Sequence, residues 1–220
     1  HAGRTRGDPR TYAEAGGVTE DEARAWIAER HGPEKLRVLE SYVTLLLAAN
    51  ATQNLISKTT EPQVWTRHIL DSAQLLRFAP DAKSWLDVGS GPGLPGIVLA
   101  ILSDKPVLMV EPRRKRVEFL TGAIGKLGLQ KSRIRQANIV QVTGEKFGAV
   151  TARAYAPLPE ILSSTIQLTT SSTIWVLPKG RSAEQELDEA RRSWQGVFHV
   201  EQSLTDADSR IIVAQQVRPR

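Results

Sequence analysis

The sequence predicts an α/β protein, in which a mostly parallel seven-stranded sheet has helices on both faces and a helical cap at its N-terminal end. From Trp85 onward, short apolar runs alternate with longer helical patterns, which is typical of parallel strands joined by right-handed crossovers. Before Trp85, apolar residues recur three and four positions apart, which predicts amphipathic helices and no strand. We therefore expect the helical cap to precede the sheet in the chain.

Three helices are predicted ahead of the first strand. Thr19 and Glu22 form an S/T-x-x-E capping box, which opens a short helix towards Arg30. Apolar residues at helical spacing predict two further helices, over residues 34–50 and 61–78. The expected organisation is a flexible tail over residues 1–18, a helical cap over residues 19–80 and a single integrated core over residues 81–220.

The core alternates strands with helices and closes on an antiparallel pair. Strands are predicted at residues 85–88, 107–111, 133–136, 149–152 and 173–177, and in the closing pair at residues 197–202 and 210–216. Helices are predicted from near Leu94 with Pro95 in the first turn, over residues 113–127 with Gly128 as the stop, from Pro157, and over residues 183–194.

Composition and charge restrict the class of protein. Hydrophobic residues make up 40% of the chain and charged residues 24%, as in ordinary soluble globular proteins, and no apolar run is long enough to span a membrane. No signal peptide is visible and cysteine is absent, which excludes disulfides and thiolate zinc sites and fits the reducing cytoplasm. We expect a cytoplasmic protein without a membrane partner. Its net charge of +5 permits a polyanionic one.

A glycine-rich turn joins the first predicted strand to the next helix. Its glycines let a ligand lie against the main chain, and the helix start presents free N–H groups, so a nucleotide-like cofactor is expected there. Two patterns overlap in this turn. Residues 91–96 satisfy G-x-G-x-x-G, the dinucleotide fingerprint, with Glu111 about 20 residues further on. Residues 87–93 match D-x-G-x-G-x-G instead.

The second pattern resembles the cofactor loop of class I S-adenosylmethionine-dependent methyltransferases, whose fold is Rossmann-like. The resemblance implies that Asp87 and the loop backbone hold the amino acid part of the cofactor, while Glu111 holds the ribose hydroxyls. A carboxylate accepts two hydroxyl hydrogen bonds at once and so suits a vicinal diol. The cofactor-binding residues implied are Asp87, Gly89, Ser90, Gly91, Gly93, Leu94, Glu111, Pro112, Ala137, Asn138 and Arg153.

Four sets of segments resemble one family within that class. They are residues 54–55 with 67–72, residues 87–96, residues 110–120, and residues 151–158 with 177–180. In this order they are similar to the bacterial small-subunit (16S) ribosomal RNA guanine-N7 methyltransferase family, also called the glucose-inhibited division protein B family. The resemblance implies methyl transfer, without a metal, to N7 of a guanine in the 530 loop of 16S rRNA. We expect a monomer acting on the rRNA, the small ribosomal subunit or an assembly intermediate.

The chemistry of methylation at guanine N7 limits the roles that the candidate polar residues can have. Guanine N7 carries a lone pair and no proton, so its methylation requires positioning and no general base. The transferred positive charge spreads into the guanine, and a cation near O6 opposes it, which favours a phosphate or the cofactor carboxylate as the partner of Arg153. The candidate catalytic residues are Asn54, His68, Arg153 and Lys179, and the candidate RNA-binding residues are Arg113, Arg114, Arg116 and Tyr155.

Several alternatives stay open. Asn54 and His68 also fit structural roles, with Asn54 as a helix cap, and Arg67 can pair with Asp71 four residues on. Gln136-Ala137-Asn138 stands where the family has Arg-Ala-Glu, so Asn138 keeps hydrogen-bonding capacity towards the adenine and loses the charge. Other functions compatible with the fold are methylation of a different RNA, an NAD-dependent oxidoreductase and a non-catalytic RNA-binding module. Without cysteine, methylation at pyrimidine C5 is excluded.

Overall fold

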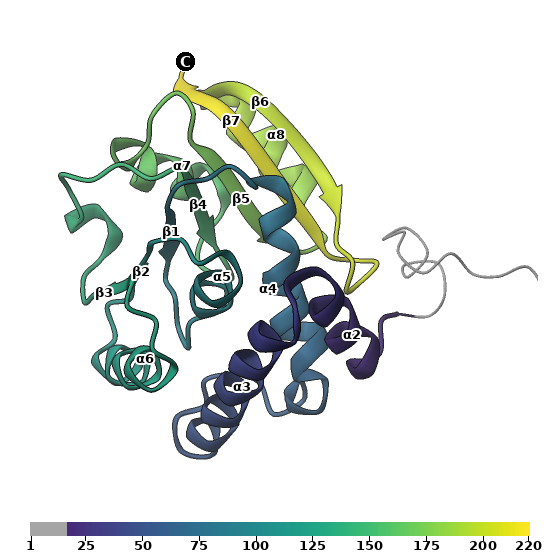
Figure 1. The fold of residues 1–220 in the computed structure, drawn as a ribbon. Helices are drawn as coiled ribbons and strands as arrows, with labels where there is room; N and C mark the ends of the chain where they lie inside the picture. Colours follow the sequence, from purple (N-terminus) through teal and green to yellow (C-terminus); the bar gives the residue numbers. More distant parts are fainter. Residues whose placement is uncertain (1–16) are drawn as a thin grey trace, which may run out of the picture.

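In the computed structural model, residues 17–220 are described and form a seven-stranded sheet of order β3-β2-β1-β4-β5-β7-β6 (Figure 1). Strands β1 to β5 are parallel, and β7 runs antiparallel between β5 and β6. The strands are β1 (Trp85–Val88), β2 (Val107–Val110), β3 (Ser132–Arg135), β4 (Ala149–Ala152), β5 (Ile174–Lys179), β6 (Trp194–Gln202) and β7 (Arg210–Pro219). The predicted topology is confirmed. The tail expected over residues 1–18 lies outside the described residues, apart from residues 17 and 18.

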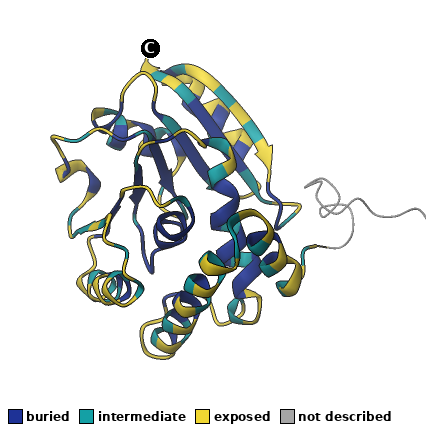
Figure 2. Cartoon of the chain, in the orientation of Figure 1, coloured by how far each residue is buried: buried dark blue, intermediate teal, exposed yellow. Residues whose placement is uncertain are grey.

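Helices cover both faces of the sheet. Buried residues of the cap pack with α5, α6 and one set of strand side chains, and the alternate set packs against α7 and α8. Figure 2 shows the resulting buried layers beneath exposed outer helix faces. The regular helices are α2 (Glu20–His31), α3 (Pro33–Gln53), α4 (Asp71–Ala73), α5 (Gly96–Ser103), α6 (Arg114–Leu127), α7 (Leu158–Thr165) and α8 (Ala183–Ser193). No helix among the described residues is both long and apolar enough to cross a membrane.

The cap begins as the sequence indicates. Thr19 Oγ1 accepts the N–H of Glu22, whose carboxylate accepts the N–H of Thr19, so the predicted capping box is present. The fully buried hydroxyl of Tyr42, on α3, donates to the carbonyl of Pro92 at 3.0 Å. The cap therefore touches the glycine turn directly.

Residues 61–78 are helical as predicted, but they do not form one regular α-helix. The segment passes from a 3₁₀ turn at Glu61–Gln63, through a π-helical stretch at Trp65–Leu70 and the short α4, to a second 3₁₀ stretch at Gln74–Phe78. Wide π turns are frequent at functional sites because they change which side chains share a face. Three polar residues of this segment point to one cavity, as described below.

Element boundaries shift at other places. Helix α5 starts at Gly96, after a cis Leu94–Pro95 peptide bond, so Pro95 precedes the helix. Strand β6 starts at Trp194 because the chain passes directly from α8 into a strand with a bulge between Gln195 and Val197. The stop of α6 at Gly128, with φ of 67°, is as predicted.

Candidate functional site

The glycine turn is held to the sheet by backbone hydrogen bonds. The N–H groups of Gly89 and Ser90 both donate to the carbonyl of Val110 on β2, at 2.8 and 3.1 Å. Gly89 and Gly91 have φ values of 69° and 56°, a region that favours glycine. The turn is thus folded tightly over the ends of β1 and β2.

Asp87 lies beneath this turn and is fully buried. Its Oδ2 accepts the N–H of Gly96 at 3.0 Å, so the start of α5 is capped by the protein itself, and the expectation of a free N–H at that position is wrong. A Cβ on Gly96 would lie 2.5 Å from the same oxygen, which explains the glycine. Oδ1 is buried without a partner, and burial raises the pKa of Asp87 to about 6.

Glu111 follows β2 and is only 2% exposed. Its Oε2 accepts the N–H of Gly91 and its Oε1 accepts the N–H of Arg113, both at 2.9 Å. The guanidinium of Arg116 lies 3.9 Å from Oε2 and 3.4 Å from a Cβ placed on Gly91. Asp87 and Glu111 are therefore neighbouring carboxylates at the ends of adjacent strands, each fixed by the turn between them.

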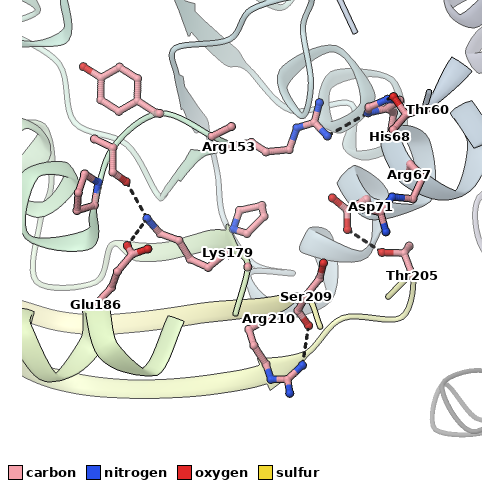
Figure 3. A pocket seen from close by; sticks show the side chains of 16 residues that line it. Thr60, Arg67, His68, Asp71, Arg153, Lys179, Glu186, Thr205, Ser209 and Arg210 are labelled. Carbon is pink, nitrogen blue, oxygen red and sulfur yellow. Dashed lines mark hydrogen bonds and ion pairs between the residues drawn. The ribbon is translucent and has the colours of Figure 1, made fainter. Parts of the chain in front are cut away.

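A cleft of about 480 Å³ opens beside this turn, at the carboxyl ends of β4 and β5 (Figure 3). The segment after β4 separates the cleft from the glycine turn, because the ring of Tyr155 lies against Gly89, 2.5 Å from a Cβ built there. The polar residues that line the cleft are Thr60, Arg67, His68, Asp71, Arg153, Tyr155, Lys179, Glu186, Thr205, Ser209 and Arg210.

Arg153 and His68 form one wall of the cleft. The guanidinium lies 3.1 Å from His68 Nδ1, and Nε2 of the same ring lies 2.8 Å from the hydroxyl of Thr60. Burial, with Arg153 and Arg67 beside it, lowers the pKa of His68 to about 3. The imidazole is therefore neutral, and because a guanidinium only donates, Nδ1 accepts and Nε2–H donates to Thr60.

Lys179 ends β5, and its side chain is 8% exposed. Its ammonium group lies 2.7 Å from both Glu186 Oε2 and the carbonyl of Ala156. Burial opposes ionisation of Glu186, but hydrogen bonds from Lys179 and Ser182 lower its pKa on balance. Lys179 thus ties the segment after β4 to helix α8.

Asp71 and Arg67 bind the loop between β6 and β7 and do not pair with each other, so the predicted i,i+4 pair is wrong. Asp71 Oδ1 accepts the hydroxyl of Thr205 at 2.9 Å, and Arg67 makes an ion pair with Asp206. The loop between β6 and β7 supplies the partners of both side chains, and these partners lie more than 130 residues away in the chain.

The other predicted catalytic residue lies elsewhere. Asn54 is exposed at the C-terminal end of α3, where it adopts φ of 50°, as in the capping alternative. It does not line the cleft, so its catalytic role stays a prediction.

Predicted RNA and adenine contacts follow β2 and β3, which lie on the same side of β1 in the sheet. Pro112, Arg113 and Arg114 are exposed where α6 begins, and Arg114 pairs with Glu118 one turn on. Asn138 is exposed, and its side chain caps the 3₁₀ turn at Ile139–Gln141, while Ala137 is half-buried.

Sequence reasoning missed several residues of the site, among them Tyr42, Thr60 and Glu186. Tyr42 counts only as an apolar position in the helical pattern, which carries no information about its hydroxyl. Thr60 contacts His68, 8 residues further on, and Glu186 contacts Lys179, 7 residues before it. Each partner lies in another element, and no sequence motif includes Thr60 or Glu186. Among the residues described, no group of three or more His, Asp or Glu side chains is arranged to hold a metal ion.

Residues 35–212 match the family model described as rRNA small subunit methyltransferase G. The chain is 46% identical to the ribosomal RNA small subunit methyltransferase G of Sphingopyxis alaskensis over 87% of this chain and 84% of that protein. It is 45% identical to the protein of the same name from Erythrobacter litoralis, over 89% and 96% of the two chains.

Solved structures share the fold at low sequence identity. A putative O-methyltransferase from Klebsiella pneumoniae superimposes with a TM-score of 0.56 at 12% identity, over 81% of this chain and 89% of that one. A ribosomal protein L11 methylase from Lactobacillus delbrueckii subsp. bulgaricus gives 0.53 at 14% identity, over 69% and 77%.

Proposed function

Because this chain belongs to the rRNA small subunit methyltransferase G family, we propose that it transfers a methyl group from S-adenosylmethionine to N7 of a guanine in the 530 loop of 16S rRNA. The NAD-dependent oxidoreductase and the non-catalytic RNA-binding module are then wrong as descriptions of the chain. The observation that best supports the specific proposal is that Tyr155 both lines the polar cleft and lies against Gly89, so only the segment after β4 stands between the cleft and the glycine turn.

The carboxylates of the turn fit this cofactor. Asp87 Oδ1 is a buried acceptor without a donor, and it suits the cationic amino group of the cofactor better than a pyrophosphate. Each oxygen of Glu111 accepts one backbone N–H and keeps a lone pair for a ribose hydroxyl. The guanidinium of Arg116 lies 3.9 Å from Oε2, so a ribose bound there would also be next to this side chain. When bound, the cofactor supplies an electrophilic methyl group on a sulfonium sulfur.

The cleft residues position the guanine and its RNA. His68 takes no proton from the substrate, since its neutral ring is occupied on both nitrogens and N7 has no proton to lose. It acts by holding Arg153, whose remaining donors face the cleft and suit an RNA phosphate or the cofactor carboxylate. The basic start of α6, with Arg113 and Arg114 exposed, is the proposed contact for RNA phosphates outside the cleft.

We propose 16S rRNA, within the small ribosomal subunit or an assembly intermediate, as the substrate of a cytoplasmic, monomeric enzyme that needs no metal. The target base must leave its stack to reach the cleft, and a loop makes this less costly than a duplex does.

The test is transfer of labelled methyl from S-adenosylmethionine to small-subunit RNA, with the product base identified by mass mapping. Arg153→Ala is expected to lower methylation about thirtyfold or more while cofactor affinity changes less than about threefold, because one charge-assisted contact is lost on the RNA side. Equal losses of both would move Arg153 to the cofactor. Absence of N7-methylguanine with the wild-type protein would overturn the proposed reaction.

A further inference from the structure

The cleft is lined by two carboxylates in the described part of the chain, and they differ in how many of their oxygens are used. Both oxygens of Glu186 accept hydrogen bonds from the protein: Oε1 accepts the hydroxyl of Ser182, and Oε2 accepts Lys179 and the N–H of Leu158. Asp71 uses only one of its two oxygens in this way. Of the two carboxylates, Asp71 is therefore the one that offers a bound molecule an oxygen without a hydrogen bond from the described residues.

The three donors that reach Asp71 all reach the same oxygen. Oδ1 accepts from Thr205 at 2.9 Å, Gln74 at 3.0 Å and Ser203 at 3.4 Å. Oδ2 makes no hydrogen bond to any described residue. Figure 3 shows the carboxylate at the cleft wall with one oxygen joined to Thr205 and the other directed into the cavity. The side chain is thus fixed with one free oxygen facing the cleft.

Neighbouring positive charges and hydrogen bonds limit the effect of burial on this carboxylate. Burial raises the pKa of Asp71, but the positive charges of Arg153 and Arg67 and the hydrogen bonds from Thr205 and Ser203 oppose that rise. In its carboxylate form Asp71 only accepts hydrogen bonds, and because all three donors of the protein lie on Oδ1, the free Oδ2 suits a donor on a bound molecule.

We infer that Asp71 recognises the Watson–Crick edge of the target guanine, with Oδ2 accepting a hydrogen bond from N1–H or the N2 amine. The inference rests on the proposed function. On this edge guanine presents two neighbouring donors, whereas adenine presents the N1 lone pair, which repels a carboxylate. Extruded bases are commonly read through this edge. Asp71 is then the residue that selects guanine over adenine.

The same contact strengthens as the reaction proceeds. The N7 lone pair forms the bond to the methyl carbon, the carbon–sulfur pair stays on sulfur, and the positive charge moves from sulfur to the guanine ring without loss of a proton. The N1–H and N2–H groups become more acidic, so a fixed anion on their edge binds the transition state more tightly than the substrate. Arg153 cannot provide this, since its charge has the opposite sign.

The experiment pairs variants of Asp71 with variants of the base. Small-subunit RNA carries guanine, inosine (no N2 amine) or 2-aminopurine (no N1–H) at the target position, and kcat/KM is measured for wild type, Asp71→Asn and Asp71→Ala. Wild type is expected to lose about thirtyfold on at least one analogue, because a hydrogen bond to a charged group is lost. Asp71→Ala is expected to be about thirtyfold slower on guanine and to lose most of that discrimination, with the loss mainly in kcat.

Ser203→Ala is the matched control, because it removes one donor from Oδ1, does not touch Oδ2, and perturbs the same loop through the contacts of Ser203 with Thr205 and Gln74. It is expected to keep the wild-type ratio between guanine and both analogues. Cofactor affinity and thermal unfolding of each variant report whether the loop between β6 and β7 stays folded, and Asp71→Asn serves if Asp71→Ala does not fold.

Unchanged ratios for both analogues in both Asp71 variants would overturn the inference while leaving the methyltransferase proposal intact. Failure of the wild type to methylate the guanine substrate would instead overturn the proposed function.

Discussion

The two halves of the site are held by different kinds of contact. Around the glycine turn, Asp87 and Glu111 accept backbone N–H groups that lie 9, 20 and 2 residues away in the chain. Around the cleft, the contacts join side chains far apart in sequence: Arg153 with His68 across 85 residues, Asp71 with Thr205 across 134 and Arg67 with Asp206 across 139.

The difference has a physical consequence. Backbone donors are positioned once two adjacent strands pair, so the cofactor half needs only an acid at each strand end. Side-chain contacts require the cap, the segment after β4 and the loop between β6 and β7 to dock first, and each immobilised side chain loses rotamer entropy. We therefore expect changes in the cofactor half to act on ligand affinity and changes in the cleft half to act on stability and turnover.

Glu111→Ala tests the cofactor half and is expected to have the largest effect. The change removes the proposed ribose acceptor and leaves the N–H groups of Gly91 and Arg113 without the carboxylate that accepts them, so the affinity for S-adenosylmethionine should fall about a hundredfold, or about 3 kcal/mol. Titration calorimetry measures it. Glu111→Gln, which keeps one acceptor oxygen, should lose less. Unchanged affinity in both would remove Glu111 from the ribose.

Lys179→Met tests whether the cleft half depends on buried pairs. Removing the ammonium group leaves the Glu186 carboxylate mostly buried with fewer donors, so the free energy of unfolding should drop by about 2–3 kcal/mol. Lys179→Met combined with Glu186→Gln should cost clearly less than the sum of the single changes. Denaturant unfolding of the four proteins gives the coupling, and simple additivity would show that the pair does not stabilise this region.

His68 makes the free energy of unfolding depend on pH, and the direction of its pKa shift fixes the sign of that dependence. Its pKa falls from 6.5 to about 3 on folding, so the unfolded chain binds a proton that the folded chain does not, and stability is lost as the pH falls below 6.5. Between pH 7 and pH 5 this residue should account for about 2 kcal/mol. His68→Gln should therefore show a shallower decline of unfolding free energy over this range. Identical declines would mean that His68 titrates normally in the folded protein.

Patterns within single elements predicted the fold well. The four residues of β1, the stop of α6 at Gly128 and the capping box at Thr19 are where the sequence places them. Each of these features depends only on residues close together in the chain: apolar periodicity for the strand, a glycine at a positive φ for the helix stop, and a reciprocal hydrogen bond for the capping box. Each can therefore be predicted without tertiary information. The placement of Asp87 and Glu111 at neighbouring strand ends follows from the same patterns.

Contacts between elements were predicted poorly. Spacing on one helix predicted that Arg67 pairs with Asp71, yet the loop at residues 203–209 binds both, because spacing reports only partners on the same helix. The partner of Lys179 and the hydroxyl contact of Tyr42 were missed for the same reason.

By itself, the sequence determined the parallel sheet, the glycine turn and the two acids that flank it, since these arise from local backbone geometry. Only the tertiary structure decided which side chains meet across the cleft, which nitrogen of His68 accepts a hydrogen bond, and which oxygen of Asp71 is left free. Those choices depend on the docking of segments that lie 85 to 139 residues apart in the chain, and such contacts follow no fixed spacing that a local sequence pattern could report.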